Sequence, residues 1–289
     1  MAAFNICKVA INDFHQLFDD LALSLSASLS DLGHDYSISI NEMRPDAINI
    51  LLGSIMFDEL LISSTLNYPY IIYQTEILDD QLGHLKNYPN YLSFMSRALS
   101  IWEYSPKNLA YLKSKGFDNV EYVPPGYHSL CEKVTWRSSP HVFDFLFIGA
   151  LSQRRAAFLA GLRKRGYAVG AITDANTAFG AKRDQVIADS KVILNVHCFE
   201  GLNTLETVRI SYLLTNRAVV VSESSDHDPY QGAVEYAEYD ALTDRCIAVL
   251  TELPSLEERS KQGYLAIKNI DMTALLRQAL LNIDIDSAT

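Results

Sequence analysis

The chain has 289 residues, 48% of them hydrophobic, which suits one large domain or two medium ones with well-filled cores. Its formal net charge of −11 argues against nucleic-acid binding as its main role, because such surfaces carry clustered positive charge. The four scattered cysteines form no Cys-x-x-Cys pair and favour reduced thiols in a cytoplasmic protein; no apolar stretch approaches the about 18 residues of a membrane span, although peripheral membrane contact stays open.

Strand and helix patterns alternate through the first half of the chain. Short apolar runs predict strands at 6–11, 36–40, 47–52, 70–73, 100–102 and 120–123. Helices are predicted at 14–32, 88–98 and 106–116, the last opened by a proline and closed by a glycine. The pattern fades from 127 to 140, which indicates a linker between domains or a loop beside a cleft.

The alternation restarts in the second half. Strands are predicted at 143–148, 168–172, 192–196, 218–222 and 234–237. Helices are predicted at 154–165, 182–190, from about 203 to 213, and at 241–250, 257–268 and 273–281. Two successive β-α series predict an α/β protein with two doubly wound, Rossmann-like domains, 1–135 and 136–289, the second ending in closing helices.

The turn from Gly149 to Arg155 (GALSQRR) follows a buried strand and opens a helix. A glycine there lets a ligand approach the backbone, and Arg154 and Arg155 suit phosphate oxygens near a helix N-terminus. The alternative is an ordinary strand-helix turn with two solvated arginines. The spacing differs from Gly-x-Gly-x-x-Gly, so the dinucleotide fingerprint is absent.

Polar residues also surround the start of the next predicted helix. Asn203 or Thr204 suits a helix N-cap, and the free N–H groups of the first turn favour a phosphate. Glu206 either completes a capping box or accepts hydrogen bonds from ribose hydroxyls, as an acidic residue does in dinucleotide folds. His197 either contacts a phosphate or sugar hydroxyl, or is a hydrogen-bonded histidine at a strand end.

Acidic residues follow other predicted strands. Asp226 and Asp228 have the pattern of a divalent-metal site, but Pro229 favours a turn or helix cap at Asp228, so we expect no metal. Glu76 and Glu103 follow strands of the first domain. Each is either a general base or hydroxyl-binding group in a cleft, or a cap or solvated charge.

Several runs together resemble a known family: FIGALSQRR, SKVILNVH and LETVRISYLLTNRAVVVSE, with YIIYQTE and YVPPGY upstream. From about Ile48 to Glu223 the chain resembles bacterial glycosyltransferases of the group 1 type, near the CgeB-like branch. The resemblance implies the GT-B fold, with two Rossmann-like domains facing a cleft and a nucleoside diphosphate-sugar donor held mainly by the C-terminal domain. It implies that Glu206 binds the donor ribose, and that Gly149 and the turn from Ser152 to Arg155 lie near the diphosphate.

The resemblance also implies a reaction. We expect a cytoplasmic, metal-independent hexosyltransferase that needs no cofactor besides its donor, with Glu76, Glu103 and His197 as catalytic candidates. The acceptor hydroxyl, on a glycan, lipid, small molecule or protein, stays open.

One departure from the family pattern leaves the stereochemistry open. Cys198 stands eight positions before Glu206, where related retaining enzymes carry a second glutamate, and Glu200 lies nearby out of register. Two alternatives remain: a nucleotide-sugar epimerase on the same architecture, and a catalytically silent nucleotide-binding or scaffold protein.

Overall fold

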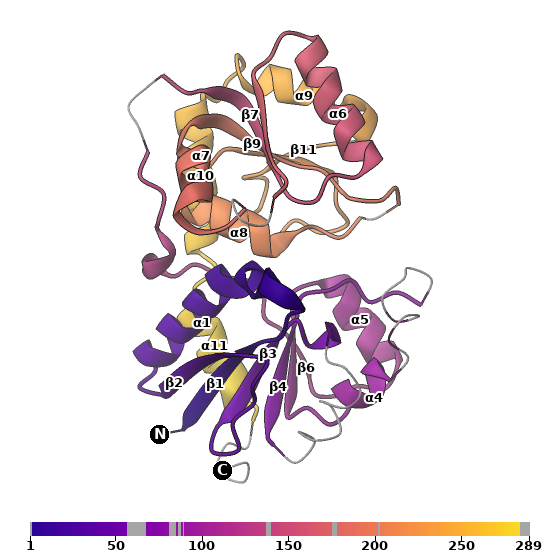
Figure 1. Ribbon diagram of the computed structural model, residues 1–289, viewed down its shortest axis with the longest axis vertical. Coiled ribbons are helices and arrows are strands. Elements are labelled where there is room, and N and C mark those ends of the chain that lie inside the picture. The colour runs from indigo at the N-terminus through magenta and orange to yellow at the C-terminus, as the bar shows by residue number, and fades with distance from the viewer. Residues whose placement is uncertain are drawn as a thin grey trace. The chain divides into compact units, whose positions relative to one another are not determined.

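The computed structural model describes residues 2–56, 68–80, 85, 88, 90–136, 140–174, 178–201 and 203–283. Parts of the predicted linker (137–139) and of the predicted helix at 88–98 lie outside this range. The chain forms two compact units (Figure 1). Unit 1 comprises Met1–Leu130 and Ile270–Thr289, and unit 2 comprises Cys131–Asn269. No helix in the described part of the chain is long and apolar enough to cross a membrane.

The sheet of unit 1 is parallel throughout. Its strands run in the order β2-β1-β3-β4-β5-β6. They are β1 (Ala3–Lys8), β2 (Asp35–Ile40), β3 (Ile48–Leu52), β4 (Tyr70–Gln74), β5 (Ser100–Glu103) and β6 (Val120–Tyr122). The apolar runs predicted all six strands, because three of them are buried at every position and their side chains need no alternation.

Helices cover both faces of this sheet. In chain order they are a 3-10 helix (Asn12–Phe18), α1 (Asp19–Asp31), a 3-10 helix (Ser54–Met56), α4 (Tyr91–Met95), α5 (Pro106–Ser114), a 3-10 helix (Ser129–Cys131) and α11 (Met272–Leu281). The N-terminal and C-terminal helices α1 and α11 share one core, in which Leu25 and Leu29 pack with Leu276. The predicted second domain ran to residue 289, whereas the structure returns α11 to unit 1, because its apolar face completes the core against α1.

Unit 2 repeats this architecture with five parallel strands in the order β11-β10-β9-β7-β8. They are β7 (Phe143–Ile148), β8 (Val169–Ile172), β9 (Ser190–Asn195), β10 (Val220–Glu223) and β11 (Glu235–Ala237). The helices are α6 (Gln153–Lys164), α7 (Gly180–Ala188), α8 (Thr207–Thr215), α9 (Tyr239–Val249) and α10 (Leu256–Lys268). The predicted class, α/β with two doubly wound Rossmann-like domains, is therefore confirmed.

The strand order of unit 2 places its topological switch point between β7 and β9. From β7 the chain moves outward to β8, then returns to the other side of β7 at β9 and continues to β10 and β11. Loops that leave the sheet in opposite directions open a crevice at such a point, at the carboxyl ends of the strands. The crevice of unit 2 is therefore bordered by the turn after Ile148 and the loop after Asn195.

Part of the predicted linker, within residues 131–136, is bound to the end of α8. The side-chain oxygen of Asn216 accepts hydrogen bonds from the N–H groups of Lys133 (2.6 Å) and Val134 (2.8 Å). Its amide donates to the carbonyl of Cys131 (3.0 Å), and its own carbonyl accepts from the indole of Trp136 (2.8 Å). Three backbone groups of this segment are therefore bonded by one asparagine side chain rather than by a strand or helix partner, which fits the absence of a regular pattern in its sequence.

Gly53 turns the chain directly after β3 in a conformation that favours glycine. Its φ is +76°, and a Cβ there would lie 2.6 Å from both the Val9 carbonyl oxygen and the Phe18 ring. Gly33, after α1, has a nearly identical φ of +78° but no atom within 4 Å of an added Cβ. Comparing alanine substitutions at the two positions therefore distinguishes the free-energy cost of the backbone conformation from the cost of steric overlap.

We predict that Gly33→Ala lowers the free energy of unfolding by about 1–2 kcal/mol, the cost of a left-handed non-glycine residue. Gly53→Ala should lower the free energy of unfolding by about 1–3 kcal/mol more than Gly33→Ala does, because its methyl group overlaps backbone and ring atoms. Urea unfolding of both variants and the parent measures the difference. Equal losses would show that the contacts around Gly53 rearrange freely.

Candidate functional site

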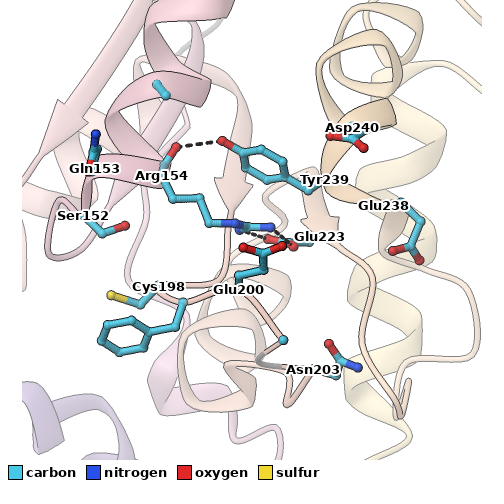
Figure 2. Close-up of a pocket in the computed structure, with 13 residues that line it drawn as sticks. Ser152, Gln153, Arg154, Cys198, Glu200, Asn203, Glu223, Glu238, Tyr239 and Asp240 are labelled. Atoms are coloured by element: carbon cyan, nitrogen blue, oxygen red, sulfur yellow. Dashed lines mark hydrogen bonds and ion pairs between the residues drawn. The ribbon is translucent and has the colours of Figure 1, made fainter.

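A pocket of about 800 Å³ lies in unit 2 at the carboxyl ends of its strands (Figure 2). Its walls come from the start of α6, the loop after β9, the end of β10 and the start of α9. Ser152, Arg154, Cys198, Glu223 and Tyr239 are among the lining residues. The pocket therefore borders the switch point, where ligands bind in doubly wound folds.

The turn between β7 and α6 depends on Gly149 and Ser152. Gly149 has a φ of +143°, and an added Cβ would lie 3.1 Å from Nη2 of Arg209. Ser152 is the N-cap of α6, and its hydroxyl accepts a hydrogen bond from the N–H of Arg155 (3.3 Å). Glycine is thus needed for conformation and close approach, and the serine satisfies one N–H at the helix start.

The two arginines of this turn have different environments, and neither is a freely solvated side chain. Arg154 lines the pocket, forms a bidentate ion pair with Glu223, and donates from Nη1 to the His197 carbonyl (3.2 Å). Arg155 is only 5% exposed and does not line the pocket. Its Nε and Nη1 donate to the carbonyls of Val196 and Ala150, each at 2.8 Å, so Arg155 ties the turn after β7 to the end of β9.

Glu206 lies in a buried polar network. Its carboxylate accepts hydrogen bonds from Nδ2 of Asn195 (2.8 Å) and Nδ1 of His197 (3.2 Å), and lies 3.5 Å from Nη2 of Arg155. The helix α8 begins only at Thr207. Glu206 is its N-cap residue, but the Glu206 side chain makes no capping hydrogen bond. The capping-box interpretation is therefore wrong, and Asn203, Thr204 and Glu206 lie before the helix rather than in its first turn. The Glu206 side chain instead points toward Asn195 and His197 at the end of β9.

Both ring nitrogens of His197 face acceptors. Nδ1 meets the Glu206 carboxylate, and Nε2 lies 3.0 Å from the carbonyl oxygen of Ser224. Burial lowers the pKa of His197, but the hydrogen bond and charge of Glu206, with the Ser224 carbonyl, outweigh burial and raise it. Burial by itself raises the pKa of Glu206, yet His197, Arg209 and Asn195 together lower it to about 2. The pair is therefore held as imidazolium and carboxylate.

Most of the lining residues were not among the predicted site residues, and two of these, Glu223 and Tyr239, contact Arg154. Glu223 is the last residue of β10, and besides pairing with Arg154 it accepts the backbone N–H of His197 (3.0 Å). The ring of Tyr239 lies 3.7 Å from the Arg154 guanidinium. The position of Glu223 after an apolar strand was a usable signal, the same one that singled out Glu76. The pairing of Tyr239 with Arg154 has no local signal.

The other predicted site residues are spread over both units. Asn203 is exposed and lines the pocket, whereas Thr204 is buried and does not. In unit 1, Glu76 is half-buried after β4. Glu103, at the end of β5, has no exposed surface; its Oε1 accepts from the Ser105 N–H and from Asn108, each at 3.1 Å. Burial raises the pKa of Glu103 well above its usual range.

Asp228 behaves as a loop cap. Its carboxylate accepts hydrogen bonds from the N–H groups of Tyr230 (2.8 Å) and Gly232 (2.6 Å), and from the hydroxyl of Tyr236 (2.9 Å). Within the described ranges no three histidine, cysteine or acidic side chains gather in a group that could hold a metal ion. The geometry therefore supports the turn-cap interpretation of Asp228.

Comparison with known sequences finds no matching family model. One uncharacterized protein of Acanthamoeba polyphaga mimivirus is 27% identical over 169 residues, which are 57% of this chain and 54% of that relative. Another from the same virus is 25% identical over 233 residues, 78% of this chain and 31% of the relative. The chain thus spans about half, or less, of these relatives' lengths, and their viral source lends no support to the bacterial branch of the resemblance.

Solved structures show the same architecture. AviGT4, a glycosyltransferase involved in avilamycin A biosynthesis, superposes with a TM-score of 0.59 at 14% identity, covering 100% of this chain and 99% of that one. An alpha-glucosyltransferase in complex with UDP and a 13-mer DNA gives a TM-score of 0.63 at 9% identity, covering 97% and 100%. The chain has the GT-B fold.

We predict that the charge on His197 stabilises unit 2 in a pH-dependent way. Because the folded-state pKa is raised above the usual 6.5, this contribution is full below that value and disappears as the pH rises through the folded pKa. The melting temperature of the parent should therefore exceed that of His197→Gln by more at about pH 6 than at about pH 9.

His141→Gln is the control for this experiment, because His141 is an exposed histidine of the same unit. The difference in melting temperature between the parent and His141→Gln should be the same at both pH values. A constant difference between the parent and His197→Gln at both pH values would contradict a charged His197.

Proposed function

We propose that this chain is a glycosyltransferase that moves a sugar from a nucleoside diphosphate-sugar donor to an acceptor hydroxyl without a metal ion. The donor binds in unit 2 with its diphosphate near the turn from Gly149 to Arg154. The observation that carries the proposal is the pocket itself. It lies at the switch point of a GT-B fold, beside the N-terminus of α6, and Arg154 lines it.

The charge around the switch point supports an anionic ligand. Arg154, Arg155 and Arg209 surround the carboxylates of Glu206 and Glu223, and His197 adds a further positive charge. Cationic groups therefore outnumber carboxylates in this network, although the whole chain is acidic. The N–H groups at the start of α6 add positive potential. Fixed groups of this kind stabilise the charge on a departing diphosphate, which is the main electrostatic demand of the reaction.

The rim of the pocket has the opposite character. Glu200, Glu238 and Asp240 are exposed and line it, together with the exposed ring of Phe199. Carboxylates accept hydrogen bonds from hydroxyls, and an aromatic face packs against the apolar face of a sugar ring. This part of the pocket suits the sugar of the donor better than it suits further phosphate groups.

Cys198 favours a second candidate, a nucleotide-binding protein without transferase activity. It lines the pocket at the position where the resemblance implies a glutamate that contacts the donor sugar. Incubation with nucleotide-sugars in buffer that contains EDTA, with and without hydroxyl acceptors, separates the candidates. A transferase forms product with an acceptor, an epimerase changes the donor alone, and a binding protein does neither.

We predict that Arg154→Ala weakens binding of a nucleoside diphosphate such as UDP by about 10-fold or more, the usual effect of losing a hydrogen bond to a charged group. Isothermal titration in EDTA measures the dissociation constants. Lys164→Ala removes one positive charge from the far end of the same helix and should change affinity little. If the two variants bind equally well, Arg154 is not a ligand contact.

We predict that Glu76→Gln leaves donor affinity nearly unchanged and slows transfer by about 100-fold or more, as the loss of a general base does. Glu103→Gln is the matched control at the neighbouring strand end. Its parent carboxyl is fully buried with a raised pKa, so the neutral amide should be tolerated. Transfer by Glu76→Gln at the parental rate would remove Glu76 from the mechanism.

A further inference from the structure

We propose that Tyr239 and Glu223 are positioning residues that hold Arg154 so that one edge of its guanidinium is left for a single phosphate group of the ligand. This inference rests on the proposed function and deepens it, because it specifies how the pocket meets the donor diphosphate. It also gives a role to two residues that were not among the predicted site residues.

Glu223 holds Arg154 end-on. Nη1 of Arg154 donates to Oε2 of Glu223 at 2.5 Å, and Nη2 donates to Oε1 (Figure 2). Both side chains are largely buried, at 18% and 11% exposure, so water competes weakly for these bonds. Glu223 is itself held by the backbone N–H of His197. The carboxylate is therefore anchored in β10 and fixes the end of the guanidinium.

Tyr239 holds Arg154 by one face. Its ring centroid lies 3.7 Å from the guanidinium carbon, within the range of a cation–π contact. Its hydroxyl donates to the backbone carbonyl of Arg154 (2.9 Å), and its ring also contacts Phe158 of α6. The tyrosine thus fixes the plane of the guanidinium, whereas Glu223 fixes its direction.

These contacts leave a defined pair of donors. A guanidinium has five N–H groups. Nη1 uses both of its hydrogens, one on Glu223 and one on the His197 carbonyl, and Nη2 uses one on Glu223. Across the residues that the structure describes, Nε–H and the second N–H of Nη2 have no partner. These two point from the same edge of the guanidinium and match two oxygens of one phosphate group.

The arrangement has a consequence for recognition. Because Glu223 balances the charge of Arg154, the phosphate is selected mainly by the fixed direction of two N–H groups. Loosening the guanidinium should therefore weaken phosphate binding even when no charge changes. At both Tyr239 and Glu223, a substitution can loosen the guanidinium without changing the charge of the site.

The experiment measures the affinity of UDP and of inorganic pyrophosphate by calorimetry for the full chain and a set of variants. Tyr239→Leu keeps an apolar side chain beside Phe158 but removes the aromatic face, and should weaken both ligands by about 3- to 30-fold. Tyr239→Phe keeps the face and should bind nearly as the parent does. Glu223→Asp keeps the charge but is one methylene too short to meet both Nη groups, and should also weaken both ligands. Thermal melting checks that each variant is folded.

A double substitution distinguishes positioning from a general structural effect. In an Arg154→Ala background, Tyr239→Leu should cause no additional loss of affinity, because the group that it positions is gone. If Tyr239→Leu and Glu223→Asp bind as the parent does, or if the losses add to that of Arg154→Ala, the inference is overturned while the proposed function stands. If the parent binds neither UDP nor pyrophosphate, both are overturned.

Discussion

One buried ion network connects the segments from which the pocket is built. The carboxylate of Glu206, before α8, meets His197 after β9 and Arg155 in the first turn of α6. Placing charges in a protein interior carries a large desolvation cost, which is offset only when every member has well-placed partners. Removing one member would leave the others buried and uncompensated. The position of each segment that borders the switch point therefore depends on the other two.

Two adjacent arginines of this region have different roles. Arg155 lies inside and joins the turn after β7 to the end of β9 through backbone carbonyls. Arg154, one residue earlier, lines the pocket, where Glu223 and Tyr239 hold it. Successive residues of a helix point about 100° apart, so a pair of arginines at its start serves a structural and a ligand-binding role at once. The buried arginine keeps the turn in place, and the other can then present its donors in a fixed direction.

The sequence predicts the sheet positions well because parallel strands that are buried on both faces appear as continuous apolar runs; the predicted strand at 143–148 coincides with β7. It also places Gly149 directly after a predicted strand, and the carboxyl ends of parallel strands share one edge of the sheet. It does not predict which arginine faces the pocket, where α8 begins or that α11 returns to unit 1. These depend on contacts far apart in the chain: Glu223 lies 69 residues from Arg154, and Tyr239 lies 85 residues from it.

The linker shows the same limit of local sequence patterns. Tyr127 is bonded to the backbone of Ile270 and Met272 within unit 1, and His128 pairs with Asp31. Asn216, at the end of α8, bonds Cys131, Lys133, Val134 and Trp136. Bonds within unit 1 therefore hold the chain at Tyr127 and His128, and bonds to the end of α8 hold it from Cys131 onward. The backbone of Lys133 and Val134 thus takes its conformation from a side chain 83 and 82 residues later in the chain, which no local pattern in the sequence reveals.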